Sequence, residues 1–279
     1  MKKAIFTLAI GDNPMYQAAI LSFKYYAKRV GADLIISDAL SYKIDVINPQ
    51  YHASPAWAEK LRIGELLNEY DRVLYLDADI LISPHAADIF EQFKNPDVVY
   101  MLNEGESQDR SAERALIESY LGKVDWPLQN GKPIYYNVGV ILASKPCKLF
   151  DFADLQGLQS VCNRIRFYEQ TYFNYLLFKH NLEHEALPSR FNRMDMFGKQ
   201  GYHKADFIHY AGKGYTKNSR RRDVQYLRDF ATMYSGIIND SEIRKLRKLA
   251  WERYLESVYT KYPMPNWLIR LCSEQFVPN

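Results

Sequence analysis

A mostly apolar segment that runs into two aspartates, VLYLDADILI at residues 73–82, constrains the fold more than any other part of the chain. Such a run is typical of a parallel strand covered on both faces, and Asp77 and Asp79 follow at its carboxyl end. Open α/β sheets place their ligands at this end of their strands. Two carboxylates beside a buried strand repel each other, and a divalent cation such as Mg²⁺ or Mn²⁺ removes that penalty. The alternative is that one Asp caps a turn and the other is solvated.

Strand-like and helix-like segments alternate along the first half of the chain. We expect strands at 4–10, 32–37, 73–77 and 97–101, and helices that begin at Pro14, at Pro55 and near residue 85. The polar segment 103–114 is expected to be a loop. Further on, we expect a strand at 134–144, a helix at 167–179, a strand that enters a glycine-rich turn at 206–215, and helices at 220–234 and 240–262. This alternation predicts an α/β fold with a largely parallel sheet.

Length and composition describe an ordinary soluble globular protein. The 279 residues suit one large domain with an appendage or two small domains, and 47% are hydrophobic while 25% are charged. The three cysteines are scattered, which indicates a reducing compartment rather than a disulfide framework. The start, MKKAIFTLAI, is interpreted as a first strand instead of a signal peptide, and no run reaches the ~18 apolar residues of a membrane span. We therefore expect a cytoplasmic protein.

The C-terminal section is basic, with 14 Lys and Arg against 8 Asp and Glu in residues 201–279. Basic residues at 220–222 and 244–248 precede an apolar cluster at 267–269. One interpretation is peripheral contact with an anionic inner membrane face, and the other is a set of helices with basic outer faces packed on a catalytic domain. Nucleic acid is not expected as a partner, because no recognition module accompanies the basic residues.

Several patches resemble glycosyltransferase family 8, the group that includes glycogenin and the lipo-oligosaccharide galactosyltransferases. They are AWAEKLRIGELL, YDRVLYLDADILI, YYNVGVILAS, YEQTYFN, LPSRFN and HYAGKG, in this order. The resemblance covers roughly residues 4–215 and implies a GT-A fold, a Rossmann-like mixed, mostly parallel sheet flanked by helices. We expect a GT-A catalytic domain at 1–215, followed by a helical basic extension at 216–279. It also implies a retaining hexosyltransferase that uses a nucleotide sugar, commonly a UDP-sugar, with Mn²⁺ or Mg²⁺. The acceptor would be a glycan, a lipid-linked sugar or a protein.

The resemblance assigns roles to particular residues. Asp77, Asp79 and His209 match the metal ligands, and a neutral imidazole suits Mn²⁺, although a lone His after an apolar strand can also be a core residue. The positions that match the nucleotide-sugar site are Ala9, Asp12, Asn13, Tyr16, Lys60, Asp77, Ala78, Gly212 and Lys213. Asp12 is equally suited to cap the helix at Pro14, and Lys60 to an exposed helix face. Tyr215 stands where the family has a lysine, so either Lys213 or Lys217 would meet the diphosphate.

Three polar residues match the family's catalytic positions. Gln170 stands where a double displacement would need a nucleophile, and an amide is a weak one, so we favour attack from the face that the leaving group departs from. Gln170 would stabilise positive charge through its carbonyl, Glu169 would orient hydroxyl groups, and Asn137 would contact donor or acceptor. The alternative is that Glu169 and Gln170 only begin a helix, where the helix dipole favours Glu.

Two other classes of protein share parts of this pattern. A sugar nucleotidyltransferase would have the sheet and the acidic pair, but LAIGDNPMY after the first strand lacks the basic, glycine-rich loop of such enzymes. A non-catalytic protein that binds carbohydrate or a membrane surface would have no need for Asp77, Asp79, His209 and Gln170 together.

Overall fold

The computed structural model describes residues 1–47, 53–259 and 264–277, which form two compact units. The first unit comprises Met1–Ile10, Ala27–Asp77 and Asp88–Phe191, and the second comprises Gly11–Tyr26, Ala78–Ala87 and Asn192–Asn279. The boundary between Asp77 and Ala78 separates the two aspartates of the acidic pair. The predicted domains 1–215 and 216–279 stay a prediction, because compactness in the folded chain does not show which segments fold alone.

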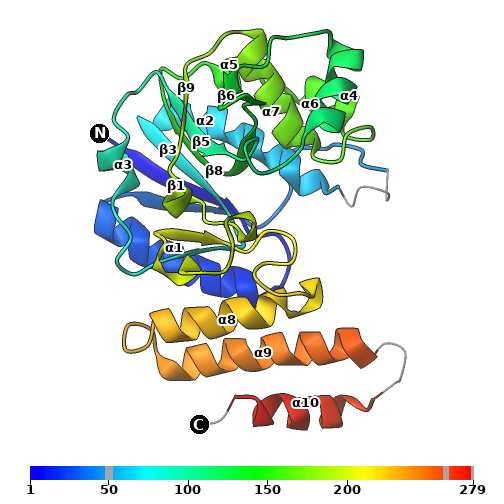
Figure 1. The fold of residues 1–279 in the computed structure, drawn as a ribbon. Helices are drawn as coiled ribbons and strands as arrows, with labels where there is room; N and C mark the ends of the chain where they lie inside the picture. The colour runs from blue at the N-terminus through cyan, green and yellow to red at the C-terminus, as the bar shows by residue number, and fades with distance from the viewer. Residues whose placement is uncertain (48–52, 260–263, 278–279) are drawn as a thin grey trace. The chain divides into compact units, whose positions relative to one another are not determined.

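A six-stranded sheet forms the centre of the first unit, in the order β2-β1-β3-β8-β5-β9 (Figure 1). β8 pairs antiparallel with β3 and β5, whereas the other neighbours pair parallel, so five strands share one direction. The strands are β1 (Lys3–Leu8), β2 (Asp33–Ser37), β3 (Arg72–Asp77), β5 (Val99–Asn103), β8 (Tyr136–Ser144) and β9 (His184–Ala186). The predicted α/β fold with a mixed, mostly parallel sheet is confirmed.

The central strands are buried along nearly their whole length. Every residue of β8 is buried, and so is every residue of β3 before Asp77. Burial on both faces explains why these strands are apolar runs without alternation. The other elements of the unit are η2 (Pro55–Leu61), α2 (Arg62–Glu69), α3 (Ile89–Gln92), α4 (Ser111–Leu121), the hairpin β6 (Leu128–Gln129) and β7 (Lys132–Pro133), α5 (Leu149–Phe152), α6 (Leu155–Val161), α7 (Tyr168–Lys179) and η3 (Ser189–Phe191).

Helix α7 lies inside the first unit and holds two of the predicted catalytic residues. Its residues from Tyr168 to Leu177 are all buried, and it packs against β8, α4, α5 and α6. Asn174 ties it to β8: its Nδ2 donates to the Tyr136 carbonyl at 2.8 Å, and the Tyr136 N–H donates to its Oδ1 at 2.6 Å. A helix buried on all sides has little freedom to shift, so the positions of Glu169 and Gln170 are fixed by packing.

The second unit is built on a short ladder and four helices. β4 (Ile80–Ile82) pairs antiparallel with β10 (Phe207–His209). The helices are α1 (Pro14–Val30), whose last residues belong to the first unit, α8 (Arg222–Met233), α9 (Asp240–Tyr259) and α10 (Asn266–Gln275), with the turns η4 (Asp195–Phe197), η5 (Tyr202–Lys204) and η6 (Ser219–Arg221). α9 packs between α8 and α10, which Figure 1 shows in orange and red. Tyr226 of α8 and Tyr234, which follows this helix, donate to the β4 carbonyls of Ile80 and Ile82, each at 2.8 Å, and so connect the ladder to the helices.

Most expected elements are present, and three expectations need correction. The helix near 85–93 is shorter, because Asp88 caps α3 through the Phe90 N–H at 2.8 Å. The expected loop at 103–114 is shorter, because β5 includes Asn103 and α4 begins at Ser111, and Glu104 within this loop is completely buried. The helix α10 was not among the expected elements, and within the apolar cluster at 267–269 it exposes Trp267 and buries Ile269. Residues 260–262 of the expected last helix lie outside the described residues. No helix within the described ranges is long and apolar enough to cross a bilayer.

Candidate active site

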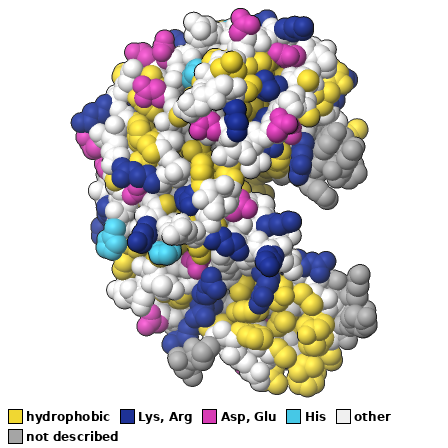
Figure 2. Space-filling model, viewed as in Figure 1, with side chains coloured by type: hydrophobic (Ala, Val, Ile, Leu, Met, Phe, Trp, Pro, Cys, Tyr) yellow, Lys and Arg dark blue, Asp and Glu magenta, His cyan; other side chains and the backbone are white. Residues whose placement is uncertain are grey.

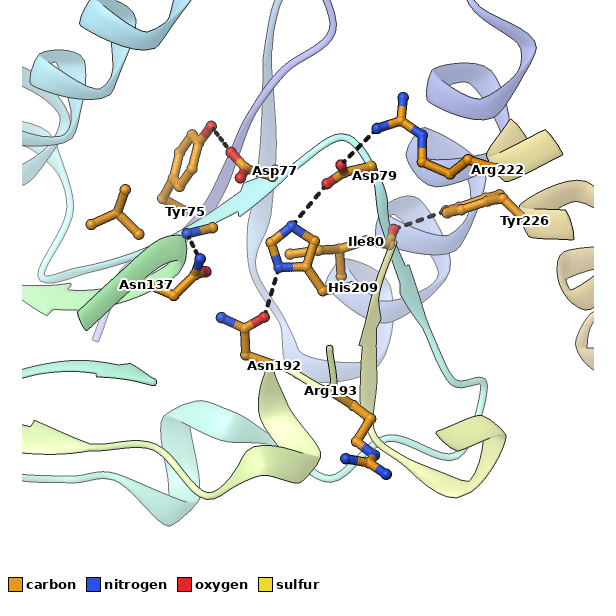
Figure 3. Close-up of polar contacts among 12 residues, drawn as sticks. Tyr75, Asp77, Asp79, Ile80, Asn137, Asn192, Arg193, His209, Arg222 and Tyr226 are labelled. Atoms are coloured by element: carbon orange, nitrogen blue, oxygen red, sulfur yellow. Dashed lines mark hydrogen bonds and ion pairs between the residues drawn. The ribbon is translucent and has the colours of Figure 1, made fainter. Parts of the chain in front are cut away.

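The β4–β10 ladder brings Asp79 and His209 together in the second unit. His209 pairs in register with Ile80, and the Tyr210 N–H donates to the Asp79 carbonyl at 3.0 Å. His209 Nε2 then lies 3.1 Å from Asp79 Oδ1 (Figure 3). The imidazole is 3% exposed and the carboxylate 18%, so the pair is largely withdrawn from water.

The surroundings of His209 and Asp79 suit a cation. Asn192 Oδ1 lies 2.8 Å from His209 Nδ1, and an amide oxygen accepts, which favours the tautomer with a proton on Nδ1. In the neutral imidazole of this tautomer, Nε2 presents a lone pair to the buried Asp79 Oδ1. Two such atoms 3.1 Å apart need a proton or a metal ion between them. With oxygen and imidazole donors, the pair suits Mn²⁺ or Mg²⁺.

Without a metal, neighbouring cations favour the charged carboxylate. Burial alone would raise the pKa of Asp79, but protonated His209 and Arg222 outweigh it and lower the pKa to about 2. Arg222 Nη1 lies 3.4 Å from Asp79 Oδ2, and Arg222 Nε donates to Asp223 Oδ1 at 3.2 Å. Asn13 Nδ2 in turn donates to Asp223 Oδ2 at 3.3 Å. A chain of polar contacts therefore connects Asn13, which is predicted to bind the nucleotide, with Asp79, which is predicted to bind the metal ion.

Asp77 takes part in a buried cluster of the first unit. Tyr75 donates its hydroxyl to Asp77 Oδ1 at 2.6 Å (Figure 3), and Lys60 Nζ lies 3.4 Å from the same oxygen and 3.1 Å from Glu169 Oε1. Burial opposes the charge on Lys60, but the carboxylates of Asp77 and Glu169 outweigh it and raise its pKa. Burial raises the pKa of Glu169, and Lys60 opposes that shift only in part. Glu169 Oε2 is buried without a hydrogen-bond partner among the described residues.

Gln170 and Asn137 meet at a third carboxylate, that of Glu104. Gln170 Nε2 donates to Glu104 Oε1 at 3.0 Å, and Asn137 Nδ2 donates to Glu104 Oε2 at 3.1 Å. Gln170 Oε1 accepts from Asn137 Nδ2 at 3.2 Å, so both the nitrogen and the oxygen of the Gln170 amide have a hydrogen-bond partner. Arg110 Nη2 lies 2.7 Å from Glu104 Oε1 and forms an ion pair with this buried carboxylate. The network fixes the orientation of the Gln170 side chain.

A glycine sets the backbone that holds Glu104. A Cβ added at Gly105 would lie 2.2 Å from the Pro133 carbonyl oxygen and 3.0 Å from the Tyr135 nitrogen, and backbone atoms cannot move aside easily. Gly105→Ala is therefore expected to lower the free energy of unfolding by about 1–3 kcal/mol. Urea unfolding measures this. Gly122→Ala, where the same Cβ would meet open space at a φ of +93°, serves as a control for backbone strain alone. A midpoint for Gly105→Ala that equals the wild-type midpoint would contradict the close approach.

The remaining predicted residues lie as follows. Asn13, not Asp12, caps α1, because Asn13 Oδ1 accepts from the Met15 N–H at 2.9 Å, whereas Asp12 accepts from Gln17 Nε2.

The other residues predicted for the nucleotide sugar differ in their exposure. The backbone N–H of Ala9 donates to the Ser37 carbonyl at 2.9 Å, Tyr16 is half-buried on α1, and Ala78 is buried. Gly212 has a φ of +60°, which favours glycine, and Lys213 is exposed. Tyr215 is buried, and its hydroxyl donates to the Arg193 carbonyl.

Sequence reasoning gave no role in the active site to several residues of these networks: Glu104, Arg110, Asn192, Arg222 and Asp223. Glu104 and Arg110 belong to a segment that looks like a polar loop, and Arg222 to a run of arginines that looks like a basic surface. Asn192 ends LPSRFN, one of the patches that carry the family resemblance, and this was the one available signal.

The mixed sheet with an acidic pair at the end of β3 defines the class of the fold, which is that of GT-A glycosyltransferases. No protein-family profile and no curated protein matches the sequence. Among solved structures, a glycosyltransferase involved in glycosylation of the major capsid of the virus PBCV-1 matches with a TM-score of 0.52 at 12% identity, over 81% of this chain and 99% of its own. An active-site mutant of LgtC matches with a TM-score of 0.50 at 14% identity, over 85% of this chain and 98% of its own. Such low identities establish the fold alone.

Proposed function

We propose that the protein is a metal-dependent, retaining glycosyltransferase of family 8. It would transfer a hexose from a nucleotide sugar, such as UDP-glucose or UDP-galactose, to a glycan, lipid-linked or protein acceptor. The observation that carries this proposal is the buried Asp79–His209 pair, whose carboxylate oxygen and imidazole nitrogen face each other 3.1 Å apart. The GT-A fold supports it, because in such sheets the ligand lies at the carboxyl ends of the strands.

In this proposal Asp77, Asp79 and His209 hold the divalent ion. Asp77 joins the pair because only Ala78 separates it from Asp79. The bound ion would neutralise the charge that develops on the leaving diphosphate. Arg222, and not Lys213 or Lys217, would be the basic residue that meets the phosphates, because its guanidinium already lies 3.4 Å from Asp79 while Tyr215, at the family's lysine position, is buried.

The first unit supplies groups suited to the sugar. Glu169 Oε2 would accept a hydrogen bond from a donor hydroxyl, with Lys60 keeping the carboxylate charged. Gln170, held by Glu104 and Asn137, would present a fixed amide dipole to the positive charge that builds at the anomeric carbon. The bond from that carbon to the diphosphate oxygen breaks as the acceptor oxygen bonds on the same face. The acceptor proton passes to the departing diphosphate.

A release assay with a panel of nucleotide sugars tests the proposal. Nucleoside diphosphate should appear with Mn²⁺ and not with chelator, and NMR of the product should show that the anomeric configuration is kept. Release of inorganic diphosphate from UTP and a sugar 1-phosphate would identify a nucleotidyltransferase instead. Binding of a sugar without any transfer or hydrolysis would identify a non-catalytic carbohydrate-binding protein.

A further inference from the structure

A cavity of about 920 Å³ lies within the second unit, lined by the segments before and after β10, by α8 and α9, and by Phe276 at the end of α10. Its lining combines cations and aromatic rings. The cations are Lys199, Lys217, Arg221, Arg228 and Arg247, and the rings include Tyr202, Tyr215, Tyr254, Trp251 and Phe276. None of the lining residues, all of which lie in the described part of the chain, is acidic. Figure 2 shows Lys and Arg side chains beside a hydrophobic patch over the C-terminal helices.

The rings and cations of this cavity are already arranged against one another. Tyr202 stacks on Tyr215 with ring centroids 3.9 Å apart, and Trp251 stacks on Phe276 at 4.4 Å. The Arg221 guanidinium lies 5.8 Å from the Trp251 ring and 5.4 Å from the Tyr254 ring. Arg228 has Asp229 as a partner at 3.3 Å, whereas Arg247 is a half-buried cation in the cavity wall. The wall therefore offers flat apolar faces next to positive charge.

The start of α8 connects this cavity with the candidate metal pair. Arg221 lines the cavity, and the next residue, Arg222, reaches Asp79 instead. Tyr215, which lines the cavity, is six residues beyond His209 on the same segment. The cavity is thus a separate site with different lining residues, joined to the metal pair by two short stretches of backbone.

The side chains that line the cavity determine which kind of ligand it can bind. Guanidinium groups bind carboxylates and phosphates, and tyrosine and tryptophan faces pack against the flat C–H faces of sugar rings. A lipid tail would need an aliphatic wall, but Val224 and Leu227 are the aliphatic residues of the lining. The strongly exposed apolar residues of α10, Trp267 and Leu271, do not line the cavity.

We propose that this cavity binds an acidic sugar chain, one that carries carboxylate or phosphate groups, through Arg247, Lys217 and the Trp251 face. The choice of a sugar chain rests on the proposed glycosyltransferase function, while the requirement for negative charge rests on the lining alone. An acidic acceptor or product chain held here would stay attached to the enzyme between transfers.

Binding of tetragalacturonic acid to the full chain, without donor or metal, tests the site. Its Kd is measured by the shift of the Trp251 indole NMR signal, which Trp251→Phe identifies among the four tryptophans. Arg247→Glu should weaken binding at least tenfold. Arg244→Glu, an exposed residue of α9 that does not line the cavity, should leave it unchanged. Thermal unfolding of both variants checks that they fold, and Lys217→Glu on a different segment provides a second variant.

Control ligands test whether the cavity binds a neutral sugar, a lipid or a nucleotide instead. Maltotetraose, which is neutral, should bind at least tenfold more weakly than tetragalacturonic acid, and equal binding would overturn the requirement for charge. Phosphatidylglycerol vesicles and UDP are tested in the same way. If either of them shifts the Trp251 signal, if Arg247→Glu abolishes that shift, and if tetragalacturonic acid causes no shift, the cavity binds a lipid or a nucleotide. The proposal then fails. Because no transfer is measured, an inactive but folded protein still gives an answer, which separates this test from that of the proposed function.

Discussion

Replacing Lys60 with methionine is expected to lower the free energy of unfolding by about 3–5 kcal/mol, the usual cost of breaking a buried ion pair from one side. The Lys60 side chain is 3% exposed and the Glu169 side chain 7%, so water cannot take the place of the lost ammonium. Asp77, whose side chain is 30% exposed, loses the same partner at 3.4 Å but keeps the Tyr75 hydroxyl. Urea unfolding at pH 7 measures the loss.

The pH dependence of this loss in stability should identify the unpaired carboxylate of Glu169 as its cause. Its pKa is already raised by burial, and without Lys60 it should rise further. Between the ordinary Glu pKa and this raised pKa, the folded state keeps a proton that the unfolded state has released. The free energy of unfolding therefore decreases as the pH rises through this range, and it increases again as the pH is lowered towards the ordinary Glu pKa. The gap between Lys60→Met and wild type should therefore be smaller at pH 5 than at pH 7.

Two variants control this experiment. Lys94→Met removes a lysine that is 72% exposed and pairs with Glu91 at 3.5 Å, and it should change stability by less than about 0.5 kcal/mol. Lys60→Met combined with Glu169→Gln should recover part of the loss, because the uncompensated charge is gone. A loss below about 1 kcal/mol for Lys60→Met alone would mean that water reaches the pair.

The sheet could be predicted because buried strands have a simple sequence signature. β3 and β8 are continuous apolar runs, and Pro14 and Pro55 mark the helix starts that the structure shows. β9, with the sequence HEA, lies at the edge of the sheet and has no apolar run to reveal it. The polar segment after β5 was misread because its buried carboxylate is paired by Arg110, and sequence patterns do not distinguish a paired buried charge from a solvated one.

The candidate site was accessible from sequence only where local pattern or family resemblance pointed to it. Asp79 stands in an acidic pair, and His209 was singled out by the patch HYAGKG. Arg222 reaches Asp79 across 143 positions of the chain, and Asp223 meets Asn13 across 210. Contacts at such separations depend on how α8 packs beside β4, which no local periodicity records. The polar partners of a site are therefore the part that needs the structure.

Asp79→Asn is expected to weaken Mn²⁺ binding about 100-fold or more and to lower sugar transfer by about 10²–10³-fold, since an amide is a poor ligand for a hard cation. Without metal, the same variant should lose part of the stability that the charge on Asp79 contributes, because the lowered pKa of Asp79 means that protonated His209 and Arg222 favour its ionised form. The loss should be modest, since the new Nδ2 can donate to a neutral His209 Nε2 3.1 Å away and the remaining oxygen can still accept from Arg222. A strong loss of Mn²⁺ affinity with only a modest loss of stability is a combination that a purely structural Asp79 would not produce.

Calorimetric titration with Mn²⁺ and thermal unfolding in EDTA measure the two effects. Asp151→Asn is the matched control, because that carboxylate is 60% exposed and pairs with Lys148 at 3.2 Å, so neither measurement should change. His209→Gln should also weaken Mn²⁺ binding, since it removes the nitrogen ligand from the other side of the same gap. Wild-type Mn²⁺ affinity in Asp79→Asn would show that the ion binds elsewhere. A large drop in its unfolding temperature in EDTA would show that the carboxylate serves Arg222 and the fold rather than a metal ion.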